Sequence, residues 1–160
     1  MTKRDLTHLG EDGQARMVDV SAKAETERMA RATGTIRMQP QTLEAIRTNS
    51  LKKGDVLAVA RVAGVMAAKK TSELIPLCHP LALTDVQIAI EIDPALPGLR
   101  VEAVARTFGR TGVEMEAISA VCVTLITVFD MAKGLDRTLV VSDITLVEKS
   151  GGRSGHFKKG

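Results

Sequence analysis

Residues 84–106 read TDVQIAIEIDPALPGLRVEAVAR, and this stretch is the clearest indication of the fold class. Apolar side chains alternate with largely polar ones from Val86 to Ile92, and the same alternation returns in residues 99–105. Alternation of this period is typical of strands with one buried face. Because residues 94–98 between them contain two prolines and a glycine, we predict a β-hairpin.

Helices are predicted on both sides of this hairpin, where apolar residues recur at helical spacing. Pro40 suits the first turn of a short helix, and a second helix should follow Gly54-Asp55. The longest helix should cover residues 113–134 approximately. Residues 35–38 and 138–147 have the composition of strands, so the hairpin is flanked by one further strand at each end.

The predicted order is strand, helix, strand, strand, helix, strand, with an extra helix in the first crossover. This is the order of a ferredoxin-like split βαβ fold, in which helices cover one face of an antiparallel sheet. We therefore expect an α+β fold with a single domain over residues 17–148. Residues 1–16 are expected to form a flexible arm, and the basic Gly/Ser-rich residues 149–160 a flexible tail.

The composition excludes several classes of protein. Three Phe and no Tyr or Trp leave few side chains on which nucleic-acid bases could stack. The net charge of +3 permits an anionic substrate without indicating a basic stripe for nucleic acid. Two cysteines suit a reducing compartment, residues 1–16 lack an apolar secretion segment, and the uncharged run 117–129 is too short to cross a membrane. We expect a cytoplasmic protein that binds neither nucleic acid nor membrane.

The longest predicted helix is apolar on nearly every side. A helix that packs only one face on a sheet should have a polar outer face, so we expect the outer face to contact another subunit. Glu116 and Asp130 on this helix are about 21 Å apart along its axis but point in similar directions. If both serve one compact pocket, the two ends of the helix must come from different subunits.

Gly109-Arg110-Thr111-Gly112 lies at a predicted strand-to-helix junction. Backbone N–H groups at a helix N-terminus, permissive glycines and an arginine together suit phosphate oxygens. The alternative is a plain turn with a solvated arginine. Glu114 and Glu116 follow in the first helical turn, where acidic residues also stabilise a helix simply by their charge.

Asp130 and Lys133 share one face of the helix end, where a carboxylate and an ammonium could act as base and acid. The alternative is a surface ion pair, which we favour on spacing alone. Cys78-His79 lies between two prolines in a rigid loop. Adjacent positions do not suit a structural zinc site, so a titrating or hydrogen-bonding His79 is the better interpretation.

Six blocks of sequence go further than spacing. In this order they resemble the cyclic pyranopterin monophosphate synthase family, often called MoaC: MVDVSAK (17–23), KGDV (53–56), LIPLCHP (74–80), TGVEMEA (111–117), DMAK (130–133) and KSGG (149–152). The blocks extend over nearly the whole chain and occur in the expected order, so the probability that the resemblance arose by chance is very small.

The resemblance implies an enzyme of molybdenum-cofactor biosynthesis, a phosphorus–oxygen lyase. Members of this family convert (8S)-3',8-cyclo-7,8-dihydroguanosine 5'-triphosphate, a cyclised GTP, to cyclic pyranopterin monophosphate and release diphosphate. It also implies a ferredoxin-like fold and a homohexamer, a trimer of dimers with active sites at subunit interfaces. Both agree with the pattern of strands and helices.

The matching positions imply roles for individual residues. Asp130 matches the family's catalytic aspartate, with Lys133 beside it and Lys53 as a second catalytic lysine. Two segments match substrate contacts, and three further cations are weaker candidates for the triphosphate. These substrate-binding candidates are Leu77, Cys78, His79, Glu114, Met115 and Glu116, with Lys69, Arg110 and Lys149 as the cations.

Two rival functions differ in what they require. A regulatory module that only senses a nucleotide needs no acid–base pair, and an RNA-binding domain of this topology needs aromatic side chains on its central strands, which residues 86–92 and 99–107 lack. Magnesium could assist the reaction, but the sequence contains no dedicated set of ligands for it. We therefore predict no resident metal or cofactor.

Overall fold

The structure is a computed structural model that describes residues 14–153 and 155–160. Most of the expected arm, residues 1–16, lies outside the described residues. Helices and strands follow one another in this order: β1 Thr26–Arg37, α1 Pro40–Arg47, α2 Val56–Lys69, α3 Thr71–Leu74, β2 Leu83–Asp93, β3 Gly98–Gly109, α4 Glu114–Ala132, β4 Val140–Ser150 and β5 Phe157–Lys158.

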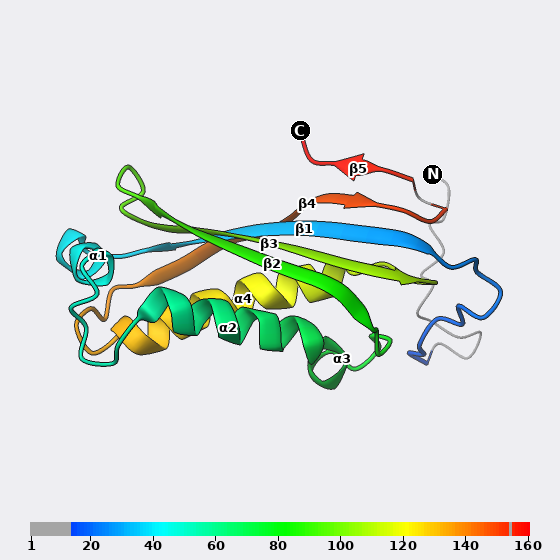
Figure 1. Ribbon diagram of the computed structural model, residues 1–160, viewed down its shortest axis with the longest axis horizontal. Helices are drawn as coiled ribbons and strands as arrows, with labels where there is room; N and C mark the ends of the chain where they lie inside the picture. Colours follow the sequence, from blue (N-terminus) through cyan, green and yellow to red (C-terminus); the bar gives the residue numbers. More distant parts are fainter. Residues whose placement is uncertain (1–13, 154) are drawn as a thin grey trace.

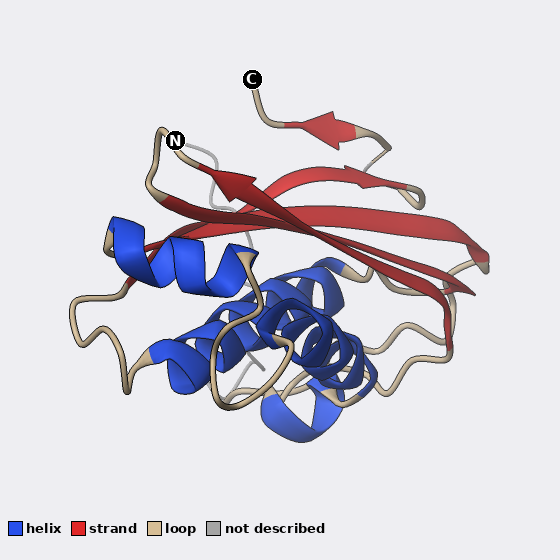
Figure 2. Ribbon diagram, turned by 60° about the vertical axis from the view of Figure 1, so that its left-hand side comes forward, coloured by secondary structure: helices blue, strands red, loops and turns tan. Residues whose placement is uncertain are grey.

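The strands form one antiparallel sheet in the order β2-β3-β1-β4-β5. The first four have the ferredoxin-like order, so the predicted α+β fold is confirmed. The predicted hairpin is also confirmed, with Ile88 opposite Ala103 and Ile92 opposite Leu99. Helices α2 and α4 cover one face of the sheet and leave the other face open (Figures 1 and 2).

Helices α2 and α4 lie side by side on the sheet and run in opposite directions (Figure 1). Asp55 caps the first turn of α2 by accepting a hydrogen bond from the Ala58 N–H at 2.9 Å, which is why α2 begins there. Gly64 lets the helices approach closely, because a Cβ at this position would overlap Thr124 and Ile88. This antiparallel packing determines where the loops at both ends of α2 meet α4.

The first strand is longer than predicted. It begins at Thr26 rather than Thr35, because its inner face carries Ala30, Ala32 and Gly34, whose small side chains give a weak apolar signal. The small residues have a structural reason: a Cβ at Gly34 would overlap Leu125 and Val121 of α4. Helix α4 therefore packs directly on the backbone of β1.

The end of the chain also differs from the prediction. The segment expected to form a tail from residue 149 onward begins inside β4, which continues to Ser150. Residues Phe157 and Lys158 then return along β4 as β5, opposite Lys149 and Glu148. A strand of two residues is defined by its pairing with a neighbouring strand, so the sequence alone does not predict it.

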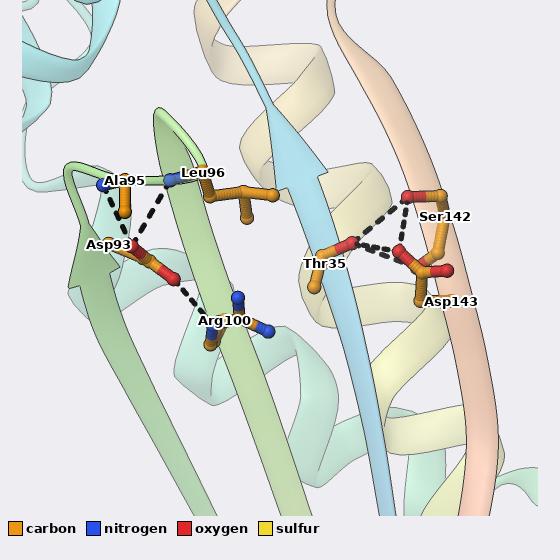
Figure 3. Close-up of polar contacts among 7 residues, drawn as sticks. All are labelled: Thr35, Asp93, Ala95, Leu96, Arg100, Ser142 and Asp143. Carbon is orange, nitrogen blue, oxygen red and sulfur yellow. Dashed lines mark hydrogen bonds and ion pairs between the residues drawn. The ribbon is translucent and has the colours of Figure 1, made fainter.

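The open face of the sheet carries local polar networks at one end of the strands (Figure 3). Asp93 accepts hydrogen bonds from the Ala95 and Leu96 N–H groups and pairs with Arg100, which closes the hairpin turn. Asp143 stands at a bulge of β4 with φ of 56° and accepts a hydrogen bond from Thr35 at 3.0 Å. These networks lie on the face away from the helices and stabilise the sheet locally.

Helix α4 is a core helix with one uncovered side. By length and composition it could cross a membrane, but more than half of its most apolar stretch is buried against the sheet and α2. Ile126 is exposed, and Val59, Val62 and Met66 of α2 are exposed as well. We call these four residues the helical apolar patch; Ile126 belongs to α4, whose outer face was predicted to be apolar, and the other three belong to α2.

Candidate active site

A cavity of about 550 Å³ opens where β1 begins, β3 ends and α4 starts. Its walls bring together segments that are far apart in the sequence. Residues expected to bind substrate contribute most of one wall, and further walls come from the segment before β1 and from the end of β4. The lining includes Lys23, Arg28, Leu77, Cys78, His79, Arg110, Thr111, Glu114, Met115, Glu116, Lys149 and Gly151.

The loop after α3 presents Leu77, Cys78 and His79 to the cavity. The ring Nε2 of His79 lies 2.9 Å from the Val18 carbonyl oxygen and so joins this loop to the segment before β1. Burial and the neighbouring Glu116 carboxyl raise the pKa of the Cys78 thiol. The thiol therefore stays protonated near neutral pH, and this site lacks an activated cysteine nucleophile.

Glu114 and Glu116 enter the cavity from the first turn of α4 but have different surroundings. The Glu114 carboxylate pairs with the Lys149 ammonium at 2.9 Å. Glu116 is only 4% exposed, and no ion pair to it is found among the described residues. Burial raises the pKa of Glu116 to about 7, and the charge of Glu114 adds to the rise. Glu114 is thus paired with a cation, whereas the Glu116 carboxyl can be neutral at physiological pH.

Cationic groups surround these two carboxyls. The Arg110 guanidinium donates a hydrogen bond to the Ser21 carbonyl oxygen at 3.1 Å and lies 3.5 Å from Glu25. The Arg28 Nε–H donates to the Gly109 carbonyl oxygen at 3.2 Å, and Arg28 is nearly buried. With Lys23 and Lys149 these groups make the cavity suitable for a multiply charged anion.

Sequence reasoning missed two of these cations. Arg28 lies in the part of β1 that was not predicted as a strand, so its direction toward the cavity could not be inferred. Lys23 ends the first block of the family resemblance, which was the only available signal for it. A second hollow of about 510 Å³ adjoins the cavity and shares both residues with it.

The predicted acid–base residues form a separate cluster at the other end of α4. The Asp130 carboxylate lies 2.6 Å from the Lys133 Nζ and 3.3 Å from the Lys53 Nζ, and Lys53 also donates to the Asp130 carbonyl oxygen at 2.8 Å. The ammonium groups of Lys133 and Lys53 lower the pKa of Asp130. The structure therefore brings Lys53 to Asp130, from which it is 77 positions away in the sequence.

This cluster is open to solvent in the single chain. The side chains of Lys53, Lys133 and Asp130 are 51%, 55% and 59% exposed. In the single chain, Asp130 and Lys133 therefore form the exposed ion pair that spacing alone favoured, and Lys53 joins it from the segment before α2.

The two groups of candidate residues stand at opposite ends of the α2–α4 pair. Lys53, ahead of α2, meets the end of α4, and Cys78, beyond α3, meets its beginning. Lys69 ends α2, is exposed and does not line the cavity. Within residues 14–153 and 155–160, no group of three or more His, Cys, Asp or Glu could hold a metal ion.

Comparisons with known proteins agree on one family. The model of the MoaC family matches residues 17–152. A protein of Desulfitobacterium hafniense named cyclic pyranopterin monophosphate synthase is 58% identical over 154 residues, which cover 96% of this chain and 93% of that protein. Proteins of the same name from Brucella ovis and Brucella melitensis are 58% identical over 152 residues, covering 95% of this chain and 92% of theirs.

Proposed function

Because the chain belongs to the MoaC family, we propose that it acts as a cyclic pyranopterin monophosphate synthase in molybdenum-cofactor biosynthesis. Its substrate is the cyclised GTP triphosphate, and its products are cyclic pyranopterin monophosphate and diphosphate. The observation that carries this proposal is the cavity, which combines four cations with a buried carboxyl in residues 17–152.

The cations of the cavity fit the triphosphate. Arg28, Arg110, Lys23 and Lys149 come from four different segments and converge on one hollow. Cyclisation at the α-phosphorus forms a new P–O bond and breaks the bond to the departing diphosphate, so negative charge develops on the leaving group. Fixed guanidinium and ammonium groups stabilise that charge without reorganising during the reaction.

Asp130, Lys133 and Lys53 carry the proton transfers. Asp130, like any unperturbed aspartate, is ionised at neutral pH, and two ammonium groups lower its pKa further; this carboxylate serves as the base. Lys133 and Lys53 hold protons within reach of the same carboxylate and serve as acids. Opening and rebuilding the ring system needs protons delivered and removed at fixed places, which a cluster of one base and two acids supplies.

A complete active site then requires two chains. The cavity and the acid–base cluster are separated by most of the length of α4, roughly 21 Å between Glu116 and Asp130. If two chains pair with their α2–α4 layers antiparallel, the cavity of one chain meets the cluster of its partner, and two such sites form per dimer. The helical apolar patch, Val59, Val62, Met66 and Ile126, supplies an apolar surface for that contact.

We propose that three such dimers assemble into a homohexamer. Covering the exposed cluster by a second chain would remove water from Asp130 and strengthen its interactions with both lysines.

We further propose that the protein is cytoplasmic. Cys78 and Cys122 are free thiols, which suits a reducing compartment.

The test is direct incubation of the purified protein with the cyclised GTP triphosphate. A synthase releases diphosphate and forms the pyranopterin, which are measured by a coupled phosphate assay and by mass spectrometry. A regulatory module on the same fold would bind the nucleotide and release nothing. Binding without turnover, in protein of confirmed oligomeric state, would reject the proposed activity.

A further inference from the structure

The end of the chain is attached to the cavity through β4. Lys149 points from β4 to Glu114 inside the cavity, whereas its neighbour Glu148 lies on the open face of the sheet. Strand β5 pairs with both residues, with Phe157 opposite Lys149 and Lys158 opposite Glu148. The last strand is therefore hydrogen-bonded to the segment of β4 whose Lys149 side chain lies in the cavity.

Several contacts hold this segment in place. His156 Nε2 lies 2.8 Å from the Glu148 carboxylate, which also pairs with Arg31 at 3.3 Å. The hydrogen bond from His156 is the main reason why the pKa of Glu148 is lowered. Beyond β5, the Lys159 N–H donates to the Val147 carbonyl oxygen at 2.9 Å, and its ammonium donates to Thr145 at 3.0 Å.

The turn after β4 is built against a second cation of the cavity. Gly151 and Gly152 have φ of 99° and 69°, a conformation that favours glycine. A Cβ at Gly152 would overlap the Arg28 guanidinium, and a Cβ at Gly151 would overlap the Glu27 carbonyl oxygen. The chain can close over Arg28 only because both residues lack side chains, and it then runs toward the segment that pairs with β4.

We propose that residues 156–160 are a positioning strap that holds Lys149 and Arg28 in place for an anionic ligand in the cavity. Without the strap, the end of β4 becomes a free edge, and the glycine turn loses the pairing that follows it. Both cations would then have to be ordered when the anion binds, which weakens binding. This inference rests on the proposed function, because diphosphate, the probe of the experiment, is a product of that reaction.

The first variant ends the chain at Gly155 and removes the strap. The second pair of variants, Lys159→Pro and Lys159→Gln, changes the charge equally, but only proline removes the N–H that donates to Val147. Affinity for inorganic diphosphate is measured by titration calorimetry at one ionic strength. Hydrogen exchange in residues 146–150 reports whether the end of β4 has loosened.

We expect the truncated chain and Lys159→Pro to bind diphosphate about tenfold more weakly than the full chain, with faster exchange in residues 146–150. Lys159→Gln should stay within about threefold of the full chain. In turnover assays the strap variants should raise KM and also lower kcat, because the two loosened cations stabilise the departing diphosphate. His156→Gln, which keeps a donor for Glu148, should bind more tightly than His156→Ala.

Equal diphosphate affinity of Lys159→Pro and Lys159→Gln would overturn the proposal, and so would a truncated chain that binds like the full one. Absence of diphosphate binding by the full chain would overturn it as well. If the truncated chain fails to fold, the Lys159 pair decides. Absence of turnover with intact diphosphate binding would reject the synthase activity alone and leave the strap to be judged by affinity.

Discussion

Glu116 and Asp130 lie on the same helix but at its two ends, one inside the cavity and the other in the exposed acid–base cluster. The rise of an α-helix separates them by about 21 Å, far more than the size of a nucleotide ring system. A single chain therefore holds two incomplete sites. The arrangement can be tested by asking whether defects in the two halves complement each other.

Mixing two inactive variants should restore activity if the defects lie in different halves. In a dimer of Asp130→Asn with His79→Ala, one site combines an intact cavity with an intact cluster, and the other site carries both defects. Random mixing of equal amounts by unfolding and refolding should therefore recover about a quarter of the wild-type rate. Diphosphate release measures the recovery.

The matched control mixes Asp130→Asn with Lys133→Ala, whose defects lie in the same half. Every site in that mixture lacks one member of the cluster, so the rate should stay at the level of the single variants. Equal rates in the two mixtures would show that each chain works alone.

Asp130→Asn by itself should leave the oligomer and the melting temperature unchanged. It should lower turnover by about 10²–10⁴-fold or more, because one acid–base group typically contributes that much. Asparagine has the size of aspartate and its amide oxygen can still accept hydrogen bonds from Lys133 and Lys53, so the substitution removes a charge but no packing. Glu44→Gln breaks another exposed pair of the same i, i+3 spacing, with Arg47, and should keep full activity. An active Asp130→Asn enzyme would contradict the assignment.

The strongest patterns in the sequence predicted the fold well. The β2–β3 hairpin follows from strict alternation of apolar residues, and α4 from a long run at helical spacing. The first half of β1 could not be predicted, because Ala30, Ala32 and Gly34 face the helices with almost no apolar surface. Strand β5 escaped prediction because pairing with β4, rather than its own residues, defines it.

The site was predictable only in part. Spacing along one helix was enough to separate Glu116 from Asp130, since helix geometry needs no tertiary information. Spacing could not bring Lys53 to Asp130, because that contact depends on α2 and α4 packing in opposite directions. The family resemblance named both residues, but their exposure in the single chain became visible only in the structure.

The close crossing of α2 and α4 can be tested with Gly64→Ala. The added methyl group would overlap Thr124 and Ile88, so we expect a loss of about 1–3 kcal/mol in the free energy of unfolding, measured by urea denaturation. Gly134→Ala is the control, because a Cβ there meets nothing within 4 Å. Equal stability of the two variants would mean that the helices are not in such close contact.

Glu116 should make the stability of the protein depend on pH. Its pKa is about 7 in the folded chain and 4.5 as an ordinary glutamate, so between these values the folded state binds more protons than the unfolded state. The free energy of unfolding should therefore fall as pH rises from 4.5 to 7, by at most about 3 kcal/mol from this group. Denaturation curves across this range measure the slope.

Glu116→Gln replaces the titrating carboxyl by a neutral amide of similar size, so the slope from this group should vanish. The variant should then be more stable than the natural chain at pH 8 and similar to it at pH 4.5, because the buried charge that forms at high pH is absent. Glu114→Gln is the matched control, since it retains the buried Glu116 carboxyl; most of the slope should persist, slightly reduced because the charge of Glu114 adds to the rise of the Glu116 pKa. If both variants keep the slope of the natural chain, the buried Glu116 carboxyl is not the source of that slope. Glu116 would then be ionised in the cavity at physiological pH.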